Sequence, residues 1–75
     1  MNANKVLDVK GMACPMPLVK TKKALNDIAS GEILEVITTD KGAKTDLTAW
    51  TKATGHELLD SKEDQDVFTF YIKKG

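Results

Sequence analysis

The residues of this chain that could do chemistry are concentrated in one stretch, Gly11-Met12-Ala13-Cys14-Pro15-Met16-Pro17, which holds the only cysteine. A cysteine thiolate is a nucleophile, and the N-terminus of a helix lowers a thiol pKa because its free amides and its dipole favour the anion. Each proline disfavours the α conformation in the residue before it, and proline is well tolerated at the first helical position. We therefore expect a helix to open between Pro15 and Pro17, with Cys14 at its mouth.

A free cysteine is more often a small buried hydrophobe than a reactive thiol. The two prolines that follow Cys14 favour the reactive thiol in this chain. A buried core cysteine needs no such restraint, whereas an exposed thiol that must be held rigidly at a helix start does. The sequence therefore favours Cys14 as a nucleophilic thiolate.

The spacing of these residues resembles that of a known family, the TusA/SirA-like small sulfur-carrier proteins. The motif consists of an aspartate, a glycine and a Cys-Pro-x-Pro core: Asp8, Gly11, Cys14, Pro15 and Pro17. Weaker matches follow at Gly31-Glu32 and Asp46-Leu47, and the resemblance extends from Val6 to Lys74. It implies a cytoplasmic protein that carries sulfur as a persulfide on Cys14. It also implies an α/β two-layer sandwich of order β-α-β-α-β-β, in which a four-stranded mixed sheet has two helices on one face.

The chain departs from the pattern of the tRNA-thiolation branch of that family at positions suited to docking. Ala13 stands where those members commonly have arginine, and Met16 stands where they have glutamate. The segment Thr39-Asp40-Lys41 replaces the Asp-Asp-Pro that many relatives have before the second helix. We expect partner docking to use residues around the cysteine: Met12, Ala13, Met16, Lys20, Lys23 and Lys41.

The composition is that of a small globular domain, which we expect to span residues 1–75. Of these residues 41% are hydrophobic and 29% are charged, which is unlike a disordered tail. A single cysteine cannot form an internal disulfide, which fits a reducing compartment. The polar start of the chain has no secretory signal, and no apolar run approaches membrane-spanning length. We therefore expect a cytoplasmic protein with no membrane association, and a monomer.

The charges are unevenly distributed although the formal net charge is zero. Five lysines against one acid fall in Met1–Lys23, and five acids against one lysine fall in Glu57–Asp66. One interpretation is a pair of ordinary solvated faces; the other is a positive cysteine end that favours the thiolate and attracts acidic partners. All eleven basic residues are lysine. Because arginine is the usual choice for bidentate recognition of phosphate and guanine, we expect no direct binding of nucleic acid.

Periodicity and turn residues predict the elements that must position Cys14. They are strand Lys5–Val9, helix Pro17–Ala29, strand Glu32–Thr39, helix Ala43–Thr54, strand Glu57–Asp60, turn Ser61–Asp66 and strand Val67–Lys73. Gly31 and Gly55 are expected to cap the two helices in the left-handed conformation. The strand Glu32–Thr39 is apolar on both alternating faces, which places it in the middle of the sheet. Ile33 and Ile37 then lie on the face without helices, either available to a partner or covered by neighbouring side chains.

The remaining candidates are weaker. Trp50 has the helical spacing of a core residue, and His56 stands alone at the start of a strand, away from other metal-ligand types. The pair Cys14 and His56 lacks the third orienting group that a hydrolase needs. We expect no metal and no cofactor.

Our first hypothesis is therefore that the protein is a sulfur relay that uses Cys14. A donor enzyme of the cysteine desulfurase or rhodanese type passes sulfane sulfur to Cys14, and an acceptor protein removes it. The chain has no second thiol that would attack the persulfide and release sulfide. Such a protein is a carrier more than a self-contained enzyme. Two alternatives remain open: a thiol-based redox-sensing or interaction module, and a structural binding domain with an inert cysteine.

Overall fold

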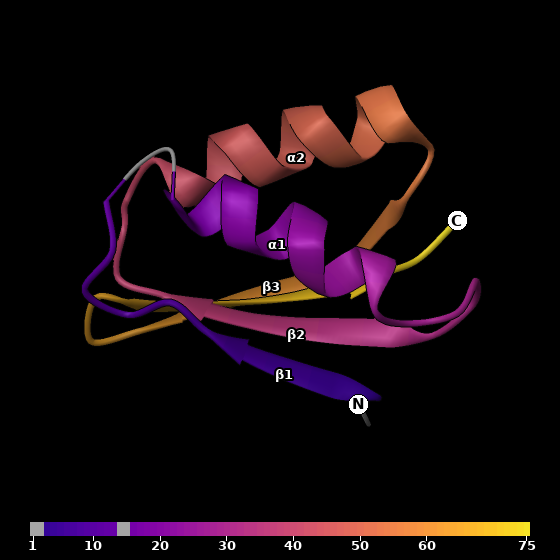
Figure 1. The fold of residues 1–75 in the computed structure, drawn as a ribbon. Coiled ribbons are helices and arrows are strands. Elements are labelled where there is room, and N and C mark those ends of the chain that lie inside the picture. Colours follow the sequence, from indigo (N-terminus) through magenta and orange to yellow (C-terminus); the bar gives the residue numbers. More distant parts are fainter. Residues whose placement is uncertain (1–2, 14–15) are drawn as a thin grey trace.

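Two helices cover one face of a four-stranded sheet in this structure, a computed structural model that describes residues 3–13 and 16–75 (Figure 1). The elements in chain order are β1 (Lys5–Asp8), α1 (Met16–Asn26), β2 (Ile33–Thr38), α2 (Ala43–Thr54), β3 (Glu57–Asp64) and β4 (Val67–Lys73). The strand order in the sheet is β1-β2-β4-β3. This arrangement confirms the predicted two-layer sandwich of order β-α-β-α-β-β.

The sheet is mixed because its strands are connected in two different ways. β1 and β2 are parallel, and α1 forms the crossover that a parallel pair requires. β4 pairs antiparallel with both β2 and β3. The most hydrophobic strand, β2, lies between β1 and β4, as its two apolar faces predict.

The core lies between the helices and the sheet. The alternating residues Leu34 and Val36 of β2 are fully buried, and Phe70 and Ile72 of β4 meet them in register. The helices contribute further buried residues, and Trp50 packs partly buried against this core, which confirms its assignment as a packing residue. On the other face of β2, Ile33 and Ile37 are half-buried.

Two predictions about α1 need correction. The helix begins at Met16, within the predicted window, but ends at Asn26 and not at Ala29. The amide of Ala29 instead donates a hydrogen bond of 2.7 Å to the Glu32 side chain, and this bond holds the chain in a turn. Gly31 does adopt the left-handed conformation, with φ +89°, but it serves the turn into β2, where its amide bonds to the carbonyl of Lys74. Gly55, with φ +82°, caps α2 as predicted.

The prediction for β3 was also wrong. We expected a strand over Glu57–Asp60 and a turn over Ser61–Asp66, but the strand continues to Asp64. The turn has only two residues, Gln65 and Asp66, both with positive φ, as tight hairpin turns require. The acidic composition was typical of a loop. Pairing with β4 overrides that tendency because β3 is an edge strand, where exposed charges are tolerated.

Candidate functional site

The loop that follows β1 turns sharply at Gly11. Val9 is buried, and its carbonyl accepts a hydrogen bond of 3.2 Å from the Met12 amide, which closes the turn. Gly11 has φ +82°, a conformation that glycine adopts at little cost. Its amide donates a hydrogen bond of 2.9 Å to the Thr39 hydroxyl, just beyond the end of β2. The loop is therefore attached to a segment far away in the sequence.

Asp8 shapes the same turn from the side of β1. Its Oδ1 accepts a hydrogen bond of 3.0 Å from the Lys10 amide, the local contact that short acidic side chains make in turns. Its Oδ2 lies 3.7 Å from the Lys10 ammonium group, an exposed ion pair. Asp8 and Gly11, the two motif residues before the cysteine, both determine the course of the loop.

Cys14 and Pro15 lie outside the described residues, and the chain is described again from Met16, where α1 begins. The Met16 amide donates a hydrogen bond of 2.9 Å to the carbonyl of Ala13. Pro17 is buried, and its carbonyl accepts a hydrogen bond of 2.7 Å from the Thr21 hydroxyl. The burial of Pro17 packs the first turn of the helix against the rest of the protein, and the two hydrogen bonds hold that turn locally.

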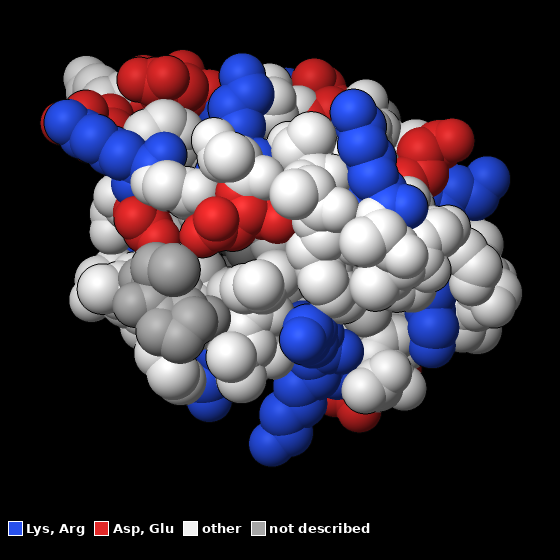
Figure 2. Space-filling model, turned by 90° about the horizontal axis from the view of Figure 1, so that it is seen from above, with Lys and Arg blue, Asp and Glu red and all other residues white. Residues whose placement is uncertain are grey.

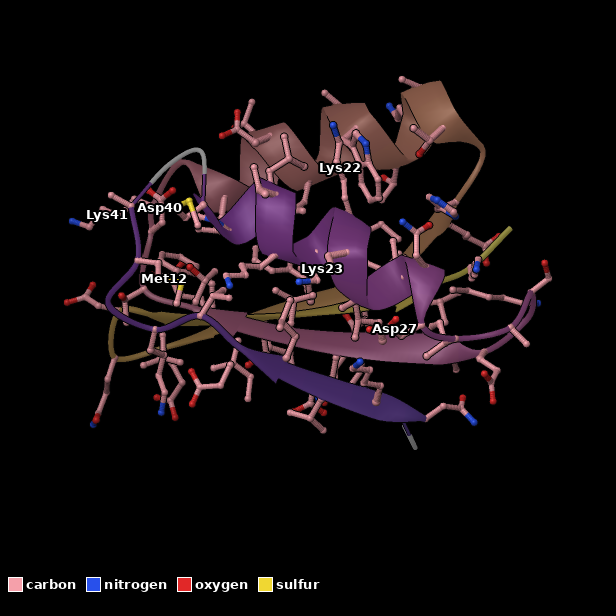
Figure 3. All side chains as sticks on the ribbon, in the orientation of Figure 1. Met12, Lys22, Lys23, Asp27, Asp40 and Lys41 are labelled. Atoms are coloured by element: carbon pink, nitrogen blue, oxygen red, sulfur yellow. The ribbon has the colours of Figure 1, made fainter. Side chains whose placement is uncertain are left out.

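A hollow of about 470 Å³ opens beside this loop. Its lining comes from two segments, the β1–α1 loop and the connection from β2 to α2: Gly11, Met12, Ala13, Thr39, Asp40 and Lys41. Figure 3 shows Met12, Asp40 and Lys41 at the same end of the molecule. Of the residues predicted to dock a partner, the structure thus brings together Met12, Ala13 and Lys41. Lys23 lies farther along α1 (Figure 3), and Lys20 is on the same helix.

Asp40 is the polar residue that organises the second segment. Its Oδ1 accepts a hydrogen bond of 3.1 Å from the Gly42 amide, and its carbonyl accepts one of 3.1 Å from the Ala43 amide, where α2 begins. Its other carboxylate oxygen is buried and has no hydrogen-bond partner among the residues that the structure describes. From the sequence, Asp40 was expected only as part of Thr39-Asp40-Lys41, a segment at positions suited to docking. The sequence could not show that one oxygen of the Asp40 carboxylate is buried without a hydrogen-bond partner among the described residues, because this depends on the tertiary structure.

Large apolar side chains are exposed close to the cysteine in the sequence. Met12 is 38% exposed, Met16 is 41% exposed and Val19 is 48% exposed. Met16 and Val19 are three residues apart on α1 and so share one face of the helix. Val19 was not predicted as a docking residue, although its three-residue spacing from Met16 was the signal available in the sequence. Exposed apolar groups of this kind often mark a surface that contacts another protein.

The charge at the hollow is mixed among the described residues. Lys41 and Asp40 both line it, so the described lining is not uniformly basic. Lys22 and Lys23 lie along α1 in the direction of Asp27, away from the hollow (Figure 3). From the helical side, Figure 2 shows lysines and acids interspersed over the surface. The sequence allowed either ordinary solvated faces or a positive charge around the cysteine. Among the described residues that line the hollow, only Lys41 supports the positive charge.

His56 contacts the end of the chain and the ring of Trp50. Its Nδ1 accepts a hydrogen bond of 3.0 Å from the Gly75 amide, and its ring lies 5.2 Å from that of Trp50. Within residues 3–13 and 16–75, no three side chains of the metal-binding types come together. The helices in this described part of the chain are too short or too polar to cross a membrane.

Comparison with known proteins gives consistent results. A family model described as "Sulfurtransferase TusA" matches residues 5–74. The chain is 60% identical over 75 residues to a Bacillus subtilis protein named "Putative sulfur carrier protein YrkI", and the match covers all of both chains. It is 48% identical over 68 residues to "Sulfur carrier protein TusA" of Allochromatium vinosum, covering 91% of this chain and 90% of that one.

Two further comparisons bear on length and fold. A second Bacillus subtilis protein, "Putative sulfur carrier protein YrkF", is 51% identical over 75 residues, and this chain spans 40% of its length. The crystal structure of a SirA-like protein from Desulfitobacterium hafniense superposes with a TM-score of 0.82 at 22% identity. That superposition covers 95% of this chain and 97% of the other. It shows that the two share a fold.

Proposed function

Because this chain belongs to the TusA family, we propose that it carries sulfane sulfur as a persulfide on Cys14 and transfers it from a donor enzyme to an acceptor protein. The family match over residues 5–74 includes the whole Cys-Pro-x-Pro motif. The relatives' names describe sulfur carriers. Those names do not specify a donor, an acceptor or a persulfide, and the proposal adds these three.

The chemistry requires only a thiolate and a partner that holds sulfane sulfur. The Cys14 thiolate attacks the terminal sulfur of the donor's persulfide, forms a new S–S bond, and releases the donor's own thiolate. The products are a Cys14 persulfide and a free donor cysteine, and no external oxidant or reductant is consumed. The same exchange in the opposite sense passes the sulfur to a thiolate of the acceptor.

The single observation that best supports this role is how the chain is held on either side of the cysteine. Before it, the loop is tied by the hydrogen bond from Gly11 to Thr39. After it, α1 begins at Met16 with the bond from the Met16 amide to Ala13, and Pro17 is buried. Fixed flanking segments suit a group that must enter another protein's active site in a narrow range of geometry.

The proposed docking surface extends from the hollow along α1. Its members are Met12, Ala13, Met16, Lys20, Lys23 and Lys41, and the exposed Val19 joins them. Met16 and Val19 offer apolar contact area, and the lysines along α1 attract carboxylates on a donor of the cysteine desulfurase or rhodanese type. We propose a cytoplasmic monomer of one domain that acts on proteins and makes no direct contact with nucleic acid.

Intact-mass spectrometry tests the proposal directly. The protein is incubated with a cysteine desulfurase and free cysteine, and the expected product is heavier by one sulfur atom, which a reducing agent removes. Cys14→Ser should gain no mass under the same conditions. Oxygen or small-thiol adducts in place of sulfur would support the redox-sensing alternative instead, and an unmodified thiol would support the inert binding domain.

A further inference from the structure

The face of the sheet opposite the helices bears a second group of side chains with a common character. Residue alternation and strand register place Val6, Ile33, Ile37 and Tyr71 on this face. Val6 is 58% exposed, and Ile33 and Ile37 are half-buried. Among the described residues, both helices lie on the other side of the sheet, so neither covers this face (Figure 1). We call it the open face.

Carboxylates outnumber lysines on the open face. Register places these acids on it: Asp8, Glu35, Glu57, Asp60 and Asp64. The lysines placed there by the same register are Lys62 and Lys73. Lys62 is directed to the Tyr71 ring, with its ammonium nitrogen 5.5 Å from the ring centroid. The outer surface of the open face is therefore acidic around a partly apolar centre.

One row of paired residues, Glu35, Tyr71 and Asp60, crosses the open face from β2 through β4 to the edge strand β3. The Tyr71 hydroxyl donates a hydrogen bond to the Glu35 carboxylate, which raises the pKa of Tyr71. Burial of the ring and the negative charges of Glu35 and Asp60 raise the pKa further. The two carboxylates are thus close to one buried aromatic ring. Their positions are fixed by the strands, unlike those of charges on a mobile loop.

Helix α1, on the other side of the sheet, has the opposite charge. α1 carries Lys20, Lys22 and Lys23 and no acidic residue between Met16 and Asn26. A chain of zero net charge therefore presents a basic helix on one side of the sheet and a mainly acidic face on the other. Neither solubility nor the sulfur chemistry requires this separation.

We propose that the open face binds a protein partner whose docking surface carries lysine or arginine side chains around an apolar centre. Opposite charges across an interface steer association and fix its register. A second copy of this chain is disfavoured on the same face, because two copies would bring their carboxylates together. A polyanion is disfavoured for the same reason. The proposal goes beyond sulfur transfer, since none of the residues that line the hollow belongs to this set and Cys14 takes no part.

The test uses a defined probe, an amphipathic helical peptide of leucine and lysine, titrated into the ¹⁵N-labelled Cys14→Ser protein and followed by NMR. We expect chemical-shift changes concentrated at the backbone amides of open-face residues in β1, β2 and β4. The affinity for the peptide should fall as salt is added. A matched peptide with glutamate in place of lysine should cause no such changes. Shifts confined to the helices, or equal binding of the glutamate peptide, would overturn the proposal.

A pair of double variants separates the open face from general acidity. Glu35→Gln with Asp60→Asn removes the two open-face carboxylates that flank Tyr71. Glu63→Gln with Asp27→Asn removes two from the helical side, where Glu63 pairs with Phe68 and Asp27 binds Lys5. The first double variant should weaken peptide binding by about twofold to tenfold, since one exposed ion pair accounts for up to about fivefold. The second should leave binding unchanged.

Two outcomes would contradict the assignment of the open face. One is equal weakening of peptide binding by both double variants, and the other is a dimer formed through the open face, detected by sedimentation.

Discussion

The amide of Gly11 donates a hydrogen bond of 2.9 Å to the hydroxyl of Thr39, joining the loop before Cys14 to the segment after β2. The two residues are 28 positions apart in the sequence, and both line the hollow beside the loop. One bond therefore couples the course of the cysteine loop to the entrance of α2. Its effect on sulfur loading can be separated from its effect on stability.

Thr39→Val should slow sulfur loading more than it destabilises the fold. Valine keeps the shape of threonine but offers no acceptor, and the exposed Gly11 amide can bind water instead, so the free energy of unfolding should fall by only about 0.5–1.5 kcal/mol. Loading rate by intact mass and urea unfolding give the two quantities. Thr39→Ser, which retains the hydroxyl, should load normally. An unchanged rate in Thr39→Val would show that the bond is not needed to place the loop.

Gly11→Ala should destabilise the protein because of backbone conformation alone. A Cβ at Gly11 would contact nothing within 4 Å, so the cost comes from φ +82°, about 1–2 kcal/mol for a residue other than glycine. Gly42→Ala is the matched control, because Gly42 has φ −80° and ψ −12°. There alanine should leave the free energy of unfolding unchanged or raise it by up to about 1 kcal/mol. Equal losses in both variants in urea would argue against this explanation.

Cys14→Ser should abolish sulfur loading while the thermal midpoint changes little. The reason is that the thiol is proposed to serve chemistry, and serine differs from it by a single atom. Circular dichroism with temperature reports the fold, and intact mass after incubation with a persulfide donor reports loading. A large fall in the midpoint would indicate a packing role for the sulfur, and residual loading would place the sulfur elsewhere.

Pro17→Ala should lower both the midpoint and the loading rate. Pro17 is buried, so the change loses about two carbons of packing, or about 1–2 kcal/mol, and also loosens the backbone at Met16, the first residue of α1. Ala24→Gly, in the buried part of α1, costs a similar amount through helix propensity but lies away from the loop. Its loading rate per folded molecule should stay normal. If Ala24→Gly slows loading as much, the effect of Pro17 is only one of stability.

Tyr71 should ionise above its ordinary pKa of 10.0, because it donates a hydrogen bond to Glu35, is buried, and lies near the charges of Glu35 and Asp60. It is the only tyrosine, so the ultraviolet absorbance of phenolate reports one group. Since the pKa is higher in the folded state, the associated stability is fully present below pH 10.0 and decreases as the pH rises through the folded pKa. Glu35→Gln should move the titration toward 10.0, whereas Glu63→Gln should not. A parent protein that titrates at 10.0 would contradict the geometry of this row.

Much of the fold was determined by local sequence. The apolar alternation of β2 placed that strand in the middle of the sheet, and the spacing of Leu47 and Trp50 defined the inner face of α2. Gly55 ended α2 where a left-handed cap was expected. The Gly11 to Pro17 motif likewise located the candidate site and the helix that follows it. These features depend on near neighbours in the chain, and a short window of sequence contains the interactions that decide them.

Other features were decided by contacts between distant residues. The acidic segment after Asp60 became part of β3 because β4 was available to pair with it, and Gly31 became a turn residue because its amide meets Lys74. The hollow lies between two segments that the hydrogen bond from Gly11 to Thr39 joins. The acidic face depends on the strand register that aligns Glu35, Tyr71 and Asp60. The sequence displays each of these residues but not their distances. Hydrogen bonds between strands and between loops form only after the chain has closed, so only the tertiary structure could bring these groups together.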